Sequence, residues 1–159
     1  FISAVYGILD TNNGTFTVAR AGHCPVVMVR DGGGPWLLRS DGLGLGLDAG
    51  PVFRRTIQEQ EIHLVHGDVF ALFTDGLVET RNGTGEEYGY DRIASAIAKA
   101  RNRTAENVLN ALLTEQTAFS EKQIYDDDLT ILVLKWTGTT SQQSNSSTSE
   151  PFTVRPTFA

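Results

Sequence analysis

Carboxylates lie beside apolar segments at two places in the chain, and carboxylates in such positions can hold a cation. Asp75 follows the apolar run VFALF in the motif FTDG, and Glu79 comes four residues later. Asp126, Asp127 and Asp128 directly precede the apolar run LTILVLKW. Carboxylates that converge repel one another unless a cation neutralises them. Oxygen ligands without His or Cys favour Mg²⁺ or Mn²⁺ over zinc or copper.

The two carboxylate positions meet only if the two apolar runs are neighbouring strands. VFALF is apolar on both faces, which predicts a central strand, and LTILVLKW predicts another core strand. Where antiparallel neighbours pair, the end of one strand lies beside the start of the other. We therefore expect Asp75 and the three aspartates to share one edge of a sheet. The alternative from spacing alone is an ordinary Asp-Gly turn and a solvated loop before a strand.

The remaining pattern predicts an α+β fold. The segments ISAVYGILD and TFTVARAG flank the turn TNNG and predict a hairpin, and PVVMVR, WLLR and FRRTIQEQEIHLV predict further strands. Apolar residues then recur at helical spacing in YDRIASAIAKAR and TAENVLNALLTEQTAF, with Asp91 and Thr104 as expected N-caps. The order is many antiparallel strands, two helices and one last strand, which is typical of the α+β class.

Length and composition bound the organisation of the chain. The 159 residues suit one folded domain, expected over residues 1–137, and the Ser, Thr and Gln-rich stretch 138–159 predicts a flexible tail. The net charge of −6 argues against nucleic acid as a partner. The single cysteine excludes an intrachain disulfide and favours a reducing, cytoplasmic location. No apolar run approaches the roughly 18 residues of a membrane-spanning helix.

Other motifs that often carry chemistry favour structural roles. The glycine-rich segment 40–51 lacks the third glycine of a dinucleotide-binding fingerprint and the lysine of a Walker loop, so it is interpreted as a long turn. His23 in AGHCP has no nucleophile motif around it, and a structural histidine is favoured over a catalytic one.

Six segments occur in the order of a known family: FISAVYGILD, FTVARAGHCPVVMV, GLGLGL, HGDVFALFTDGLVETRN, GEEYGYDRI and DDDLTILVLKW. Together they resemble the C-terminal two-thirds of the bacterial PPM-type (PP2C-like) serine/threonine phosphatases of the SpoIIE/RsbU group. The resemblance implies an antiparallel β-sandwich flanked by helices, with two Mn²⁺ or Mg²⁺ ions. It also implies hydrolysis of phosphoserine or phosphothreonine on a partner protein, as in anti-sigma-factor antagonist switches.

The resemblance assigns site residues one by one. Asp75 and Asp127 match metal-binding aspartates of the family. Gly76 would let the backbone pass close to the site, and Asp128 would support the neighbouring ligand. No catalytic side chain beyond the metal ligands is implied. Glu79 matches an acid of the family without an assigned role, and His23 lies in a matched segment that is expected to be scaffold.

One family motif does not occur in these residues. The D-x-x-G-H-G-like segment, whose aspartate bridges both metals, would precede Phe1 together with N-terminal strands and helices of the fold. The chain alone is therefore expected to be inactive, and exposed strand edges raise the possibility of a homodimer. The alternative is a non-catalytic PP2C-like regulatory or interaction module.

Overall fold

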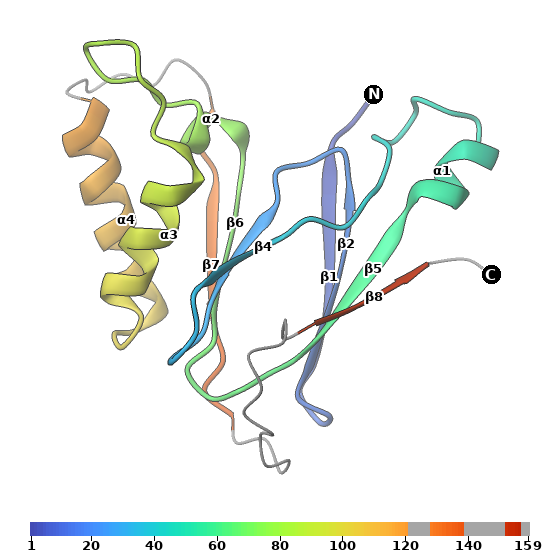
Figure 1. The fold of residues 1–159 in the computed structure, drawn as a ribbon, viewed down its shortest axis with the longest axis horizontal. Helices are drawn as coiled ribbons and strands as arrows, with labels where there is room; N and C mark the ends of the chain where they lie inside the picture. The colour runs from blue at the N-terminus through green and yellow to red at the C-terminus, as the bar shows by residue number, and fades with distance from the viewer. Residues whose placement is uncertain (121–127, 139–151, 157–159) are drawn as a thin grey trace. The chain divides into compact units, whose positions relative to one another are not determined.

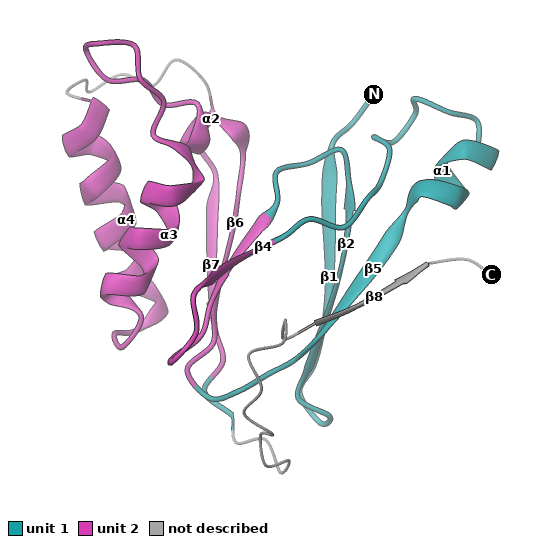
Figure 2. Cartoon of the chain, in the orientation of Figure 1, with its two compact units in different colours: residues 1–25, 38–66, 137–159 teal, residues 26–37, 67–136 magenta. Residues whose placement is uncertain are grey.

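The computed structural model describes residues 1–120, 128–138 and 152–156. The chain forms two compact units (Figure 2). Unit 1 comprises residues 1–25, 38–66 and 137–159, and unit 2 comprises residues 26–37 and 67–136.

Unit 1 is built on an antiparallel sheet with the strand order β1-β2-β5-β8 (Figure 1). The predicted hairpin is present as β1 (Ala4–Asp10) and β2 (Thr15–Ala21). β5 (Gln58–His63) pairs with β2, and β8 (Phe152–Pro156) pairs with β5. One face of the sheet is buried through alternate residues, including Phe16, Val18 and Ile62.

A short helix replaces part of a predicted strand in unit 1. The strand prediction over FRRTIQEQEIHLV is wrong for its first residues, because α1 (Pro51–Thr56) precedes β5. The Asp48 carboxylate accepts the N–H groups of Gly50, Val52 and Phe53 at 2.9, 2.8 and 3.1 Å. Pro51 has no N–H to satisfy and favours helical φ at the first position, so the helix starts there.

Unit 2 is built on the sheet β4-β3-β6-β7, with β4 (Pro35–Leu38) at one end; Leu38 itself falls in unit 1. β6 (Val69–Phe73) lies between β3 (Val26–Val29) and β7 (Ile131–Lys135) and is antiparallel to both. All four residues of β3 and four of the five residues of β6 are buried. The prediction of VFALF as a central strand is therefore confirmed.

Two long helices cover this sheet in unit 2 (Figure 1). α3 (Gly89–Ala100) packs against β3, α4 (Ala105–Ser120) packs against β7, and the helices pack against each other. Thr104 caps α4, since its hydroxyl accepts the N–H of Asn107 at 3.2 Å. The Asp91 cap is wrong, because α3 begins two residues earlier and Asp91 lies in its first turn.

The α+β fold class with antiparallel sheets and flanking helices is confirmed. The predicted flexible tail falls mainly outside the described residues, and within it residues 152–156 form β8. None of the helices in the described part of the chain is long and apolar enough to cross a membrane.

Candidate functional site

Thr74 joins the end of β6 to the residues that lead into β7. Phe73 pairs with Ile131 at this end of the ladder. The Thr74 N–H donates to the Thr130 carbonyl at 3.1 Å, and the Thr130 N–H donates to the Thr74 hydroxyl at 3.0 Å. The same hydroxyl donates to the Asp128 carbonyl at 2.9 Å. The two strand ends therefore converge as the sequence predicts.

Asp75 begins the one-turn helix α2 (Asp75–Val78) directly after this junction. Its side chain is exposed, and its Oδ1 accepts the N–H of Gly76 at 3.1 Å. Its carbonyl accepts the N–H of Glu79 at 2.9 Å. The Oδ2 atom has no hydrogen-bond partner among the described residues. The carboxylate thus keeps one oxygen available for a cation or a substrate.

The other predicted site residues differ in what the structure shows of them. Asp128 is exposed and lies beside Thr74, whereas Asp127 lies outside the described residues. Gly76 is buried inside α2, and Glu79 is an exposed residue at the C-terminal end of that helix. Their roles at a metal remain predictions.

The chemistry of these donors fits Mn²⁺ or Mg²⁺. Asp75 directly after the end of β6 and Asp128 before the start of β7 both have exposed carboxylates. Hard divalent cations prefer such oxygen ligands. Within residues 1–120, 128–138 and 152–156, no group of three or more His, Cys, Asp or Glu side chains is placed to hold an ion. The carboxylates of the described residues are ligands of the type that these ions bind, but they supply only part of a ligand set.

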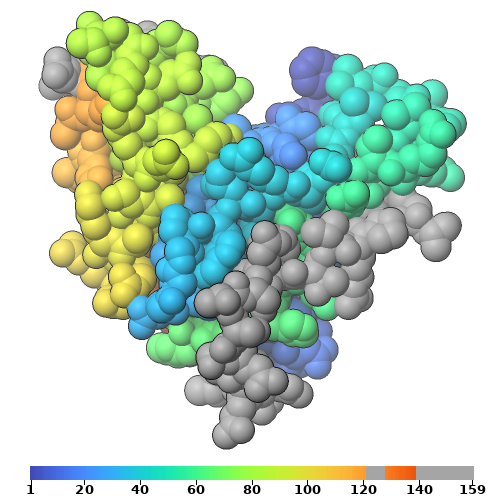
Figure 3. Space-filling view, in the orientation of Figure 1, coloured from blue at the N-terminus to red at the C-terminus, as the bar shows by residue number. Residues whose placement is uncertain are grey.

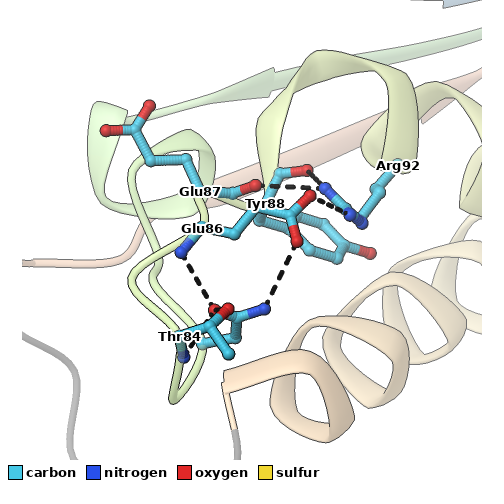
Figure 4. A network of polar contacts seen from close by, with 6 residues as sticks. Thr84, Glu86, Glu87, Tyr88 and Arg92 are labelled. Atoms are coloured by element: carbon cyan, nitrogen blue, oxygen red, sulfur yellow. Dashed lines mark hydrogen bonds and ion pairs between the residues drawn. The ribbon is translucent and has the colours of Figure 1, made fainter.

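A tightly bonded loop, residues 80–88, connects α2 to α3 (Figure 4). The Asn82 Oδ1 accepts the N–H groups of Thr84 and Glu86 at 3.0 and 2.9 Å. Arg92 of α3 turns toward the loop, and its Nη2 donates to the Glu86 carboxylate at 2.5 Å. In Figure 3 this loop and α3 form a continuous part of the surface of unit 2. The loop therefore has a defined shape beside the Asp75 turn.

Tyr88 closes this loop at its junction with α3. Its N–H donates to the Thr80 carbonyl at 2.8 Å, and its ring centroid lies 5.3 Å from that of Phe119. Burial, assisted by the negative charge of Glu115, raises the pKa of Tyr88 to about 12. Its buried hydroxyl has no hydrogen-bond partner among the described residues.

His23 and the glycine-rich segment lie in unit 1. The His23 Nδ1 lies 3.1 Å from the Ser3 hydroxyl, and its carbonyl accepts the Arg20 Nη1 at 2.6 Å. The Gly22 N–H donates to the Gly42 carbonyl at 2.9 Å. These contacts give the segment a packing role against the end of β2. The scaffold role of His23 and any role in a metal site both remain predictions.

Sequence reasoning missed a buried ion pair in unit 2. The Arg30 guanidinium donates twice to the Asp68 carboxylate, at 2.8 and 2.7 Å, and the Asp68 side chain is fully buried. Val29 pairs with Val69, so Arg30, directly after β3, lies opposite Asp68, directly before β6. Opposite charges at the ends of PVVMVR and before VFALF were the available signal.

Solved structures of low sequence identity share this fold. The SiaA-PP2C domain of Pseudomonas aeruginosa superposes with a TM-score of 0.71 at 20% identity, covering 84% of this chain and 51% of that one. The RsbU and RsbW domains of Rv1364c from Mycobacterium tuberculosis give 0.68 at 24% identity, covering 87% and 38%. The Mn-presoaked phosphatase domain of SpoIIE from Bacillus subtilis gives 0.60 at 15% identity, covering 89% and 59%.

Sequence comparison points to the same group. Protein IcfG of Synechocystis is 26% identical over 134 residues, which are 84% of this chain and 20% of that protein. The chain thus spans about a fifth of its curated relative and between 38% and 59% of these three solved chains. The family model for Stage II sporulation protein E (SpoIIE) matches residues 1–137. This chain therefore belongs to the SpoIIE family and has the PP2C-like phosphatase-domain fold of the SpoIIE, RsbU and SiaA type.

Proposed function

We propose that this chain is part of a metal-dependent protein serine/threonine phosphatase. The carrying observation is the exposed Asp75 carboxylate, which Thr74 holds beside the entrance to β7 in a chain of the SpoIIE family. The substrate class is a phosphoserine or phosphothreonine of a cytoplasmic partner protein in a bacterial signalling switch of the anti-sigma-antagonist type.

The family resemblance assigns each candidate residue its role in this proposal. Asp75 and Asp127 would hold the cations, and Asp128 would support the neighbouring ligand Asp127. Two bound Mn²⁺ or Mg²⁺ ions supply an activated water and neutralise charge on the phosphoryl oxygens. Thr74 keeps the two carboxylate-bearing segments in register, and the exposed carboxylate of Asp75 is accessible to a protein-bound phosphate. The proposal requires no side-chain nucleophile.

Manganese is the ion chosen for the test, because one similar solved structure, a SpoIIE phosphatase domain, is described as Mn presoaked. The test is phosphate release from a phosphoserine peptide with Mn²⁺, in a polypeptide that carries a D-x-x-G-H-G segment ahead of these residues. We expect Asp75→Asn to reduce release by about a hundredfold or more, because one metal ligand loses its charge. The 159-residue chain alone should release none. Near-normal release by Asp75→Asn would refute the assignment of Asp75.

A second candidate function is a non-catalytic PP2C-like regulatory or interaction module. In this function the SpoIIE-family fold would bind a partner protein without hydrolysing phosphate, so a complete metal site would not be needed. The same assay separates the two functions. The module is supported if the longer polypeptide releases no phosphate with or without Mn²⁺, both unsubstituted and as Asp75→Asn.

A further inference from the structure

Helix α4 carries a fully buried glutamine where an apolar residue is expected. Its buried face consists of Val108, Leu112, Gln116 and Ser120, and the exposed fraction of Gln116 is 0%. The stripe is apolar in its first half and polar toward the end of the helix. A buried amide is costly unless it is hydrogen-bonded, so its partner indicates what it is there to hold.

The partner of Gln116 is Thr80, which in turn bonds the α2 turn. The Gln116 Nε2 lies 3.0 Å from the Thr80 Oγ1, and the Thr80 Oγ1 lies 2.7 Å from the Gly76 carbonyl oxygen. A carbonyl oxygen only accepts, so the single hydroxyl proton of Thr80 goes to Gly76. The hydroxyl oxygen must then accept from Gln116, which puts the amide nitrogen toward Thr80. The direction of both bonds is therefore determined.

These two bonds anchor the far side of the turn that begins with Asp75. Thr74 fixes the near side through Thr130 and Asp128, and Thr80 fixes the Gly76 carbonyl on the other side. Within the turn, the Glu79 N–H donates to the Asp75 carbonyl at 2.9 Å and the Leu77 N–H donates to the Thr74 carbonyl at 3.2 Å. A helix of one turn has little intrinsic stability, so external bonds determine how rigidly Asp75 is held.

We propose that Gln116 and Thr80 are positioning residues that fix the Asp75 turn from helix α4. The inference that this fixing preserves cation affinity rests on the proposed function, whereas the rigidity of the turn does not. Neither residue is placed to touch a cation or a substrate. Their effect passes through the Gly76 carbonyl to the adjacent Asp75.

Amide hydrogen exchange on the 159-residue chain tests the rigidity directly. Thr80→Val removes the hydroxyl and Gln116→Met removes the side-chain amide. Each replacement has about the size of the original side chain. We expect exchange at the Leu77 and Glu79 amides to accelerate about fivefold, the effect of losing one hydrogen bond of ordinary strength. Exchange at Phe70 in β6 should stay unchanged. Thr80→Ser retains the hydroxyl and should restore slow exchange.

Thr114→Val is the matched control. Thr114 lies on α4 and its hydroxyl donates to the Asn110 carbonyl at 2.7 Å, within the helix and away from α2. It should leave exchange at Leu77 and Glu79 unaltered. Unchanged exchange in both Thr80→Val and Gln116→Met would overturn the proposal, as would equal acceleration in Thr114→Val.

Mn²⁺ titration by electron paramagnetic resonance tests the consequence for the site, in the longer polypeptide that carries a D-x-x-G-H-G segment ahead of these residues. We expect the dissociation constant to rise about fivefold in Thr80→Val and to recover in Thr80→Ser. Accelerated exchange with an unchanged dissociation constant would overturn the positioning role. If the longer polypeptide binds no Mn²⁺ without any substitution, the proposed metal function fails, and the exchange experiment still decides whether Gln116 and Thr80 fix the turn.

Discussion

At the scale of single residues, Tyr88 shows how packing changes chemistry. The residue is 2% exposed, with its ring against Phe119 and its hydroxyl unpartnered among the described residues (Figure 4 shows its position under Arg92). An apolar environment disfavours the phenolate, which is the main reason its pKa is raised to about 12. The sequence shows a tyrosine at this position but not its burial, because Phe119 comes from a distant helix.

This pKa predicts a loss of stability at alkaline pH. The unfolded chain releases the phenol proton near pH 10, whereas the folded chain retains it until about pH 12. The contribution of the group is therefore intact below pH 10 and is lost as the pH rises from 10 toward 12, by at most about 3 kcal/mol. Urea unfolding at pH 8, 10 and 11 measures it.

Tyr88→Phe is the comparison for that measurement. Removing an unpartnered buried hydroxyl should change the free energy of unfolding at pH 8 by less than about 1 kcal/mol. The variant should lose the additional decline in stability above pH 10. An equally steep decline in Tyr88→Phe would show that other groups cause it.

At the scale of elements, the strands and the two long helices were predictable, and the short helices α1 and α2 were not. The strand VFALF and the helices around IASAIA and VLNALL follow the local hydrophobic pattern. α1 and α2 depend on single contacts instead: the Asp48 carboxylate for α1, and the Thr74 and Thr80 bonds for α2. Such short helices leave no periodic trace in a sequence.

The candidate site divides in the same way. The approach of the Asp75 turn to Asp128 was predictable because these residues flank apolar runs that pair as neighbours. Gln116 and the Arg30–Asp68 pair were not, because their partners are set by tertiary packing. Where a polar residue interrupts an apolar helical stripe, as Gln116 does, the sequence offers a signal without naming the partner.

The contact between the glycine-rich segment and β2 also belongs to this scale. A Cβ at Gly42 would lie 1.8 Å from the Arg20 carbonyl oxygen, a distance that no rotamer change relieves. Gly42→Ala should therefore force the segment away from β2 and lower the free energy of unfolding by about 3 kcal/mol or more. Chemical denaturation followed by circular dichroism measures this change.

Gly34→Ala provides the matched control for that substitution. A Cβ at Gly34 meets nothing within 4 Å. Its free energy of unfolding should stay within about 0.5 kcal/mol of the unsubstituted chain. Equal effects of the two substitutions would show that the close approach at Gly42 does not determine stability.

At the scale of the whole molecule, the chain is a SpoIIE-family domain whose candidate ligands come from segments far apart in sequence. β6 and β7 bring Asp75 within reach of the residues around Asp128, although more than fifty residues separate them. Helix α4 lies between these strands in the sequence. Its Gln116 is connected to the Asp75 turn by hydrogen bonds through Thr80. The pairing of β6 with β7 therefore both builds the sheet of unit 2 and positions the candidate site.

The central claim is that Asp75 and Asp127 hold a divalent cation. The most direct test is Mn²⁺ titration by electron paramagnetic resonance of a polypeptide that carries a D-x-x-G-H-G segment ahead of these residues, with Asp91→Asn as a control because Asp91 is an exposed carboxylate on α3. We expect Asp75→Asn and Asp127→Asn each to weaken binding about tenfold or more, since even indirect partners of a metal ligand contribute that much. Asp91→Asn should bind as the unsubstituted chain does. Equal Mn²⁺ affinity in Asp75→Asn and the unsubstituted chain would contradict the account.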